Sequence, residues 1–187
     1  MRVDVKSRIK TIAETAVFIA LIAVCAWITV PLPNGVPVTM QTFAVFFVAA
    51  LLKPKQSAVV IAGYIMLGVI GAPVFSSMGS GVAQLLGKTG GYITGFLFAA
   101  PLAAFLRRVF GDKKLGDIFA MIIGLAVCYV FGCLWFWWVY TNNTGAVGLV
   151  QVAAWTILPY IIPDIIKITL AVGAARVIGK HMDKLKL

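Results

Sequence analysis

Long apolar stretches, separated by proline, glycine and charged residues, set the strongest constraint on this 187-residue sequence. Six such runs occupy residues 11–30, 39–52, 57–71, 90–106, 115–140 and 150–178. A helix needs roughly 20 apolar residues to cross a bilayer, and a chain of this length has room for about six such helices. The hydrophobic content of 61% also lies far above that of a soluble domain. The sequence therefore predicts an all-α integral membrane protein, with residues 1–187 forming one domain of about six transmembrane helices.

The basic residues predict how these helices are oriented. With the N-terminus in the cytoplasm, fourteen of the sixteen lysines and arginines fall on the cytoplasmic side, as the positive-inside rule requires. These are Arg2, Lys6, Arg8, Lys10, Lys53, Lys55, Arg107, Arg108, Lys113, Lys114, Arg176, Lys180, Lys184 and Lys186. Of the other two, Lys88 falls in an outside connection and Lys167 within the last run. We therefore expect a multi-pass protein of the cell membrane with both termini cytoplasmic. Because the cations cluster at the ends of apolar runs, they do not indicate a nucleic-acid partner.

Two of the predicted outside connections differ from tight turns. Residues 30–39 contain three prolines, which prevent helix, and residues 71–92 are long, rich in glycine and only mildly polar. Irregular backbone at membrane depth is tolerated where it is buried in protein or lines a cavity. We interpret the two segments as a lid over a site that opens to the outside. A simple glycine-rich surface loop is the alternative for the second segment.

Asp164 and Lys167 are the one pair of opposite charges set within an apolar run. Charged side chains at membrane depth are costly, so they usually face the bundle interior and pair with each other or with a ligand. Their spacing of three places them on one face of a helix, and Pro163 beside them can kink that helix. The pair predicts a binding site for a small solute; an internal salt bridge that only fixes helix packing is the alternative.

Neutral polar residues lie next to the two irregular segments. Gln41 and Thr42 open the second run, and Gln84, Thr89 and Tyr92 lie in or beside the glycine-rich connection. A few convergent polar groups among apolar walls suit a small amphipathic ligand. Each of these residues alone could equally serve only to satisfy the backbone.

Small and aromatic residues predict further contacts. Ala16 and Ala20 form a stripe in the first run that allows close approach of another helix, either within the bundle or on a partner protein. A similar stripe of Gly87, Gly91 and Gly95 is expected to pack internally. The aromatic residues of the segment 135–140 are expected to form a belt at the outer membrane interface.

Several signatures of enzymes are missing from the sequence. The one histidine, His181, lies in the basic tail, and neither a phosphate-binding loop nor a Gly-x-Ser-x-Gly elbow occurs. Cys25, Cys128 and Cys133 lack the spacing and the fourth ligand of a metal site, so we interpret them as small packing residues. We therefore predict no catalytic residues, no metal and no ability to hydrolyse ATP. An intramembrane enzyme or a structural membrane subunit remains the alternative from a different class.

Four motifs occur in a specific order along nearly the whole chain: Val36-Pro37-Val38-Thr39-Met40-Gln41-Thr42, Gly71-Ala72-Pro73-Val74-Phe75, Thr89-Gly90-Gly91-Tyr92 with Gly95-Phe96, and Pro159-Tyr160 with Pro163-Asp164 and Lys167. Together they resemble the BioY family, the biotin-specific substrate-binding (S) components of energy-coupling factor (ECF) transporters. Lys88 and Ile162 depart from the resemblance, since the family commonly has proline and glycine there.

The resemblance implies a six-helix S component that captures biotin from outside. It would dock onto a transmembrane coupling protein that carries two cytoplasmic ATPases, and it would need no cofactor of its own. Ala16 and Ala20 match the family's stripe that contacts the coupling protein. The residues expected to bind biotin are Asp164, Lys167, Gln41, Gln84, Thr89, Gly91 and Tyr92. Alternative functions are an S component for another vitamin or a stand-alone carrier of small solutes.

Overall fold

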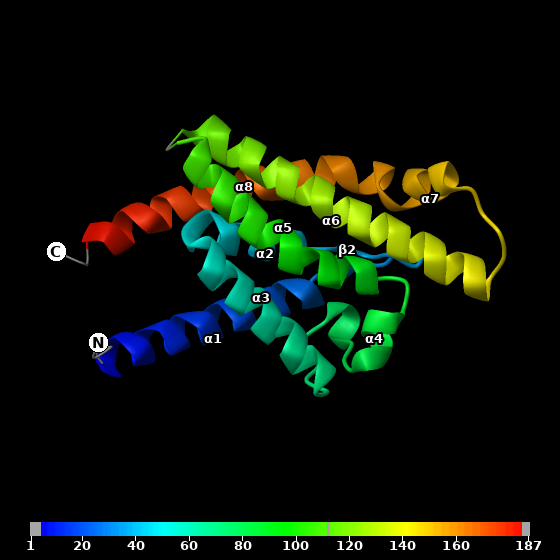
Figure 1. Cartoon of the computed structure of the whole chain (residues 1–187), viewed down its shortest axis with the longest axis horizontal. Coiled ribbons are helices and arrows are strands. Elements are labelled where there is room, and N and C mark those ends of the chain that lie inside the picture. Colours follow the sequence, from blue (N-terminus) through cyan, green and yellow to red (C-terminus); the bar gives the residue numbers. More distant parts are fainter. Residues whose placement is uncertain (1–4, 112, 185–187) are drawn as a thin grey trace.

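The computed structural model describes residues 5–111 and 113–184, and the fold is helical throughout (Figure 1). The elements in chain order are α1 (Val5–Trp27), β1 (Thr29–Val30), β2 (Val38–Thr39), α2 (Gln41–Leu51), α3 (Pro54–Val69), a 3-10 turn η1 (Ser76–Met78), α4 (Val82–Leu86), α5 (Gly90–Val109), α6 (Lys114–Asn143), α7 (Leu149–Thr156) and α8 (Leu158–Lys184). The prediction of an all-α bundle is confirmed, apart from one two-stranded ladder of two residues per strand.

The two ends of the bundle differ in charge. In Figure 1, α1 begins and α8 ends at the same end, where the α2–α3 and α5–α6 connections also lie. The opposite end holds α4 and the α6–α7 connection. The described part of the chain thus gathers its basic clusters at one end, in keeping with the orientation predicted from the charges. Arg2 and Lys186 lie outside the described residues, and the cytoplasmic placement of both termini stays a prediction.

The helices are unequal in length. Three segments among the described residues are long and apolar enough to cross a membrane. They are Arg8–Trp27 within α1, the whole of α5 and the whole of α6. By contrast, α2 has 11 residues and α3 has 16, which corresponds to roughly 16 and 24 Å at 1.5 Å per residue. A hydrocarbon core is about 30 Å thick, so the chain before α2 must cover part of that depth without helix. The count of six spans stays a prediction.

The proline-rich connection before α2 is held by strand pairing. Thr29 pairs with Thr39 and Val30 with Val38, and the Met40 N–H donates to the Ile28 carbonyl at 3.1 Å. This ladder satisfies backbone groups that lipid cannot, which is the condition for irregular backbone inside a membrane protein. The segment between the strands is thereby fixed in place against the bundle.

The last apolar run is two helices instead of the single helix that the sequence predicted. The break lies at Ile157, two residues before Pro159, which has no N–H to donate to the Trp155 carbonyl four residues back. That carbonyl accepts instead from the Asn34 Nδ2 at 2.6 Å. The broken helix thus supplies an acceptor that ties the proline-rich connection to α7.

The pair α5 and α6 forms the centre of the bundle through close backbone contact. A Cβ placed on Gly91 would lie 2.2 Å from the Trp135 Cβ, and one on Gly95 would lie 3.1 Å from the Phe131 Cβ. The internal packing predicted for Gly91 and Gly95 is confirmed, whereas Gly87, the third glycine of that stripe, is only partly buried and lies against helix α4. The predicted aromatic belt is only partly correct: Trp138 is exposed, but Phe136 is fully buried because its face of α6 turns toward α7 and α8.

A buried carboxylate joins three helices at the basic end of the bundle. Asp117, near the start of α6, is 1% exposed. Its Oδ1 accepts from the Arg107 Nε of α5 at 3.1 Å, and its Oδ2 accepts from the Arg176 Nε of α8 at 2.8 Å. Sequence analysis had assigned both arginines only to membrane orientation.

Candidate functional site

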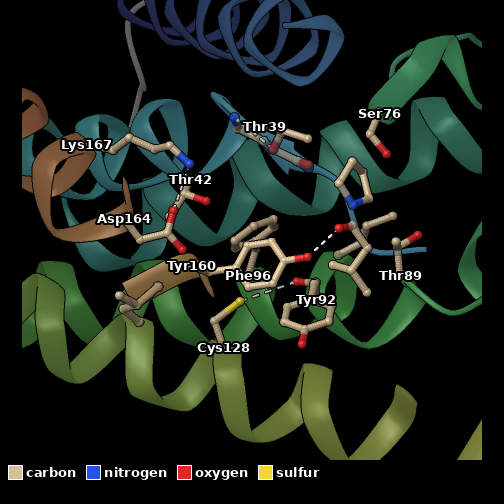
Figure 2. Close-up of a pocket in the computed structure, with 15 residues that line it drawn as sticks. Thr39, Thr42, Ser76, Thr89, Tyr92, Phe96, Cys128, Tyr160, Asp164 and Lys167 are labelled. Atoms are coloured by element: carbon tan, nitrogen blue, oxygen red, sulfur yellow. Dashed lines mark hydrogen bonds and ion pairs between the residues drawn. The ribbon is translucent and has the colours of Figure 1, made fainter. Parts of the chain in front are cut away.

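A cavity of about 560 Å³, its open mouth included, lies inside the bundle between the proline-rich connection and helices α2, α5, α6 and α8 (Figure 2). The cavity is lined by Val36, Pro37, Thr39, Gln41, Thr42, Ser76, Thr89, Tyr92, Ile93, Phe96, Leu125, Cys128, Tyr160, Asp164 and Lys167. Both segments interpreted as a lid contribute to it, so the second is more than a simple surface loop.

The predicted charged pair forms one side of this cavity. Lys167 donates from Nζ to the Asp164 Oδ1 at 2.8 Å, and the two residues are 7% and 4% exposed. The Tyr129 hydroxyl of α6 donates to the other carboxylate oxygen, Asp164 Oδ2, at 2.7 Å. The carboxylate and the ammonium therefore face the cavity, and the phenol of Tyr129 holds the carboxylate in place. Mutual neutralisation lowers the cost of burying the two charges.

The first turn of α2 supplies neutral polar groups beside the pair. Gln41 is 5% exposed and donates from Nε2 to the Tyr64 hydroxyl at 2.9 Å, while Tyr64 donates onward to the Val74 carbonyl at 3.0 Å. Within the described residues, the Gln41 Oε1 has no hydrogen-bond partner and remains available as an acceptor. Thr42 follows Gln41 and lies near Lys167 in Figure 2.

Hydrogen bonds to α8 fasten the proline-rich connection over the cavity. The Tyr160 hydroxyl donates to the Val36 carbonyl, and the Asn34 Nδ2 donates to the Tyr160 oxygen at 3.1 Å. Asn34 also accepts the Val36 N–H on its Oδ1 at 3.0 Å. On the other side, the Tyr92 hydroxyl of α5 donates to the Thr156 carbonyl at 3.0 Å, next to the helix break.

Five of the seven residues predicted to bind the ligand line this cavity, and the other two, Gln84 and Gly91, do not. Gln41, Thr89, Tyr92, Asp164 and Lys167 line it, as predicted. Gln84 lies instead in a second, outer hollow, where its Nε2 is 3.4 Å from the Thr89 Oγ1.

Gly91 does not line the cavity, and its position gives it a packing role against Trp135 of α6. The departures from the family pattern have little effect on the cavity walls. Ile162 is 72% exposed and faces away from the bundle, and Lys88 lines only the outer hollow.

Sequence analysis missed several residues of the cavity wall, and it also missed Tyr129, which does not line the cavity but holds Asp164 by a hydrogen bond. Tyr129 lies within a long apolar run, and only its polar hydroxyl in that context could have marked it. Phe96 and Tyr160 were noted as parts of motifs but were not given a place in the site. Cys128, interpreted as a packing residue, also lines the cavity, with its Sγ 3.6 Å from the Tyr92 carbonyl oxygen.

The arrangement can bind a solute that is polar at one end and apolar along its length. Asp164 and Lys167 offer an acceptor and a donor, while Ile93, Phe96 and Leu125 provide apolar walls. Among the described residues no group of three or more His, Cys, Asp and Glu side chains could hold a metal ion. The fold and cavity therefore define a helical membrane protein that binds a small solute within the bundle.

Comparison with known proteins identifies the particular family. The BioY family model matches residues 1–184, and the chain belongs to the BioY family. It is 36% identical over 163 residues to the probable biotin transporter BioY of Pyrococcus horikoshii, covering 87% of this chain and 92% of that protein. It is 32% identical over 165 residues to the biotin transporter BioY of Thermotoga maritima, covering 87% and 91%.

A solved structure confirms the fold. The crystal structure of the S component for biotin from an ECF-type ABC transporter matches with a TM-score of 0.84 and 24% identity, covering 96% of this chain and 95% of that one. Membership of the BioY family makes this chain a membrane transport protein and not an enzyme.

Proposed function

We propose that this protein captures biotin from outside the cell membrane and serves as the S component of an ECF-type ABC transporter. The observation that carries the proposal is the buried Asp164–Lys167 pair on the wall of this cavity, in a chain of the BioY family. Its relatives from Pyrococcus horikoshii and Thermotoga maritima are named as biotin transporters, which supports biotin over another vitamin.

Biotin has the chemical groups that this cavity can match. Its ureido group offers N–H donors and a carbonyl acceptor, and its ring sulfur and valeryl chain are apolar. The Asp164 carboxylate and the unpaired Gln41 Oε1 can accept from ureido N–H groups, while Lys167 can donate to the ureido carbonyl. The rings of Tyr92, Phe96 and Tyr160 would cover the apolar part of the ligand.

We expect purified protein in detergent to bind biotin in the absence of ATP, because the cavity is complete within this chain and the sequence contains no nucleotide-binding motif. Isothermal titration calorimetry measures the affinity directly. Thiamine and riboflavin, titrated in the same way, serve as controls for an S component of different specificity. A folded sample that gives no heat with biotin would contradict the assignment.

The proposed transporter also needs a coupling protein and two ATPases, and the first helix offers a surface for the coupling protein. Ala16 and Ala20 are exposed on α1, whereas Ile22, Ala23 and Ala26 are buried against the bundle. Nothing in the described chain covers the stripe, which favours a partner over the internal packing that was its alternative. Close approach of a second membrane helix is the interaction that small residues at this spacing permit.

Replacing Ala16 or Ala20 with Trp is expected to abolish copurification with the coupling protein and to leave biotin affinity unchanged, because the added bulk prevents close helix approach away from the cavity. Leu170→Trp, which adds bulk at an exposed position of α8, is the matched control and should retain both properties. Joint loss of biotin binding and copurification in the alanine variants would mean that the stripe packs within the bundle.

A further inference from the structure

A second hollow lies next to the cavity and shares several lining residues with it. This second hollow is lined by Gly35, Pro37, Ser76, Ser77, Gln84, Gly87, Lys88 and Thr89. Pro37, Ser76 and Thr89 also line the main cavity. Figure 2 shows Ser76 and Thr89 on the side of the cavity opposite Asp164 and Lys167. The outer hollow therefore forms an entrance to the cavity, on the side away from the charged pair.

Lys88 gives this entrance a positive charge that no carboxylate offsets. Its Nζ lies 5.5 Å from the centre of the Tyr140 ring, and its Cδ would be 3.4 Å from a Cβ built on Gly35. Residues 28–40, 70–89 and 144–148, which form the connections at this end, contain no aspartate or glutamate. Within the described residues Lys88 makes no ion pair, and its position over the partly buried Tyr140 ring leaves its charge without a counter-charge.

Lys88 and Lys167 therefore differ in whether their ammonium groups are free to bind an anionic group of a ligand. The Lys167 ammonium is buried and already paired with Asp164 at 2.8 Å. The Lys88 ammonium is exposed, lies on a flexible stem and keeps its charge available. The lining of the outer hollow contains one charged side chain, Lys88, beside neutral hydrogen-bonding groups such as those of Ser76 and Gln84. This uncompensated cation attracts an anionic group.

We propose that Lys88 recognises the carboxylate end of the ligand at the entrance, while the Asp164–Lys167 pair receives the uncharged end. This inference rests on the proposed function, and it adds Lys88 as the residue that selects the anionic ligand over neutral derivatives of it. Of the two lysines, Lys88 meets the carboxylate because it makes no ion pair within the described residues and lies at the mouth, where the flexible tail of a bound ligand would point.

The test compares biotin with biotinamide, in which the tail carboxylate is a neutral amide and the ureido group is unchanged. The intact protein should prefer biotin by about tenfold, the size of one charge-assisted hydrogen bond at a partly exposed site. Lys88→Gln should lose this preference, because its affinity for biotin falls to that for biotinamide while its affinity for biotinamide stays the same. Lys114→Gln, which removes an exposed cation at the opposite end, should retain the preference.

The outcomes separate this inference from the function on which it rests. If Lys88→Gln binds biotin and still prefers it to biotinamide as the parent does, the carboxylate is recognised elsewhere and the inference is wrong. A parent protein that binds the two ligands equally would also overturn it. If the parent binds neither ligand, the proposed function itself fails.

Discussion

Asp164→Asn and Lys167→Ala are each expected to abolish detectable biotin binding and also to destabilise the empty protein. Either change leaves the other member of a pair that is 4% and 7% exposed without its counter-charge. Breaking a buried pair in this way costs roughly 3–5 kcal/mol. For Asp164→Asn, the Tyr129 hydroxyl also loses its charged acceptor, the Oδ2 at 2.7 Å. Calorimetric titration measures the binding loss, and thermal unfolding in detergent measures the loss of stability.

The double variant Asp164→Asn with Lys167→Met separates the two effects. With no lone charge left at membrane depth, much of the thermal stability should return, because uncharged replacements of a buried pair are often tolerated. Binding should stay absent, since the donor and acceptor for the ligand are both gone. Lys180→Met, which makes the same lysine-to-methionine change at an exposed position of α8, is the control for that substitution and should resemble the parent. If the double variant bound biotin like the parent, the pair would serve packing alone.

The regular parts of this fold could be predicted because lipid imposes a simple rule on sequence. Every backbone group in the hydrocarbon region needs an internal partner, so long apolar runs become helices and their ends carry the charge. The runs near α2, α3, α5 and α6 were located to within three residues for this reason, while α1 begins six residues before its predicted run. The charged pair could be predicted as well, since a spacing of three within a helix fixes that Asp164 and Lys167 meet.

The missed features depend on contacts between distant segments. Asn34 donates to the Trp155 carbonyl 121 positions away, and this acceptor exists only because Pro159 breaks the last run. Tyr129 reaches Asp164 from another helix, 35 positions away. Neither contact has a local pattern that would reveal it. Gly91 was assigned to the binding site because it belongs to a recognisable local motif. Its contact with Trp135 of α6, which gives it a packing role instead, is again a contact with a distant segment.

The second large effect is expected at the basic end of the bundle, where Asp117→Asn should destabilise the protein without changing biotin affinity. The variant leaves Arg107 and Arg176 facing a neutral amide and weakens the link among α5, α6 and α8. The two arginine side chains are 30% and 26% exposed, so solvent can recover part of the loss. We therefore expect a cost of about 2–3 kcal/mol, below that of a fully buried pair, and a drop in Tm of about 5–10 °C.

Biotin affinity should be unchanged in this variant because the network is distant from the cavity. Asp117 precedes Leu125, the first cavity residue on α6, by 8 positions, which corresponds to roughly 12 Å along the helix axis. Arg108→Gln, at an exposed position beside Arg107, removes a basic residue that makes no hydrogen bond or ion pair with Asp117 within the described residues, and it should leave Tm close to that of the parent. Equal Tm values for Asp117→Asn and Arg108→Gln would mean that the buried carboxylate contributes little to stability. A fall in biotin affinity without a fall in Tm would mean instead that the charge at this end acts on the cavity through the helices it joins.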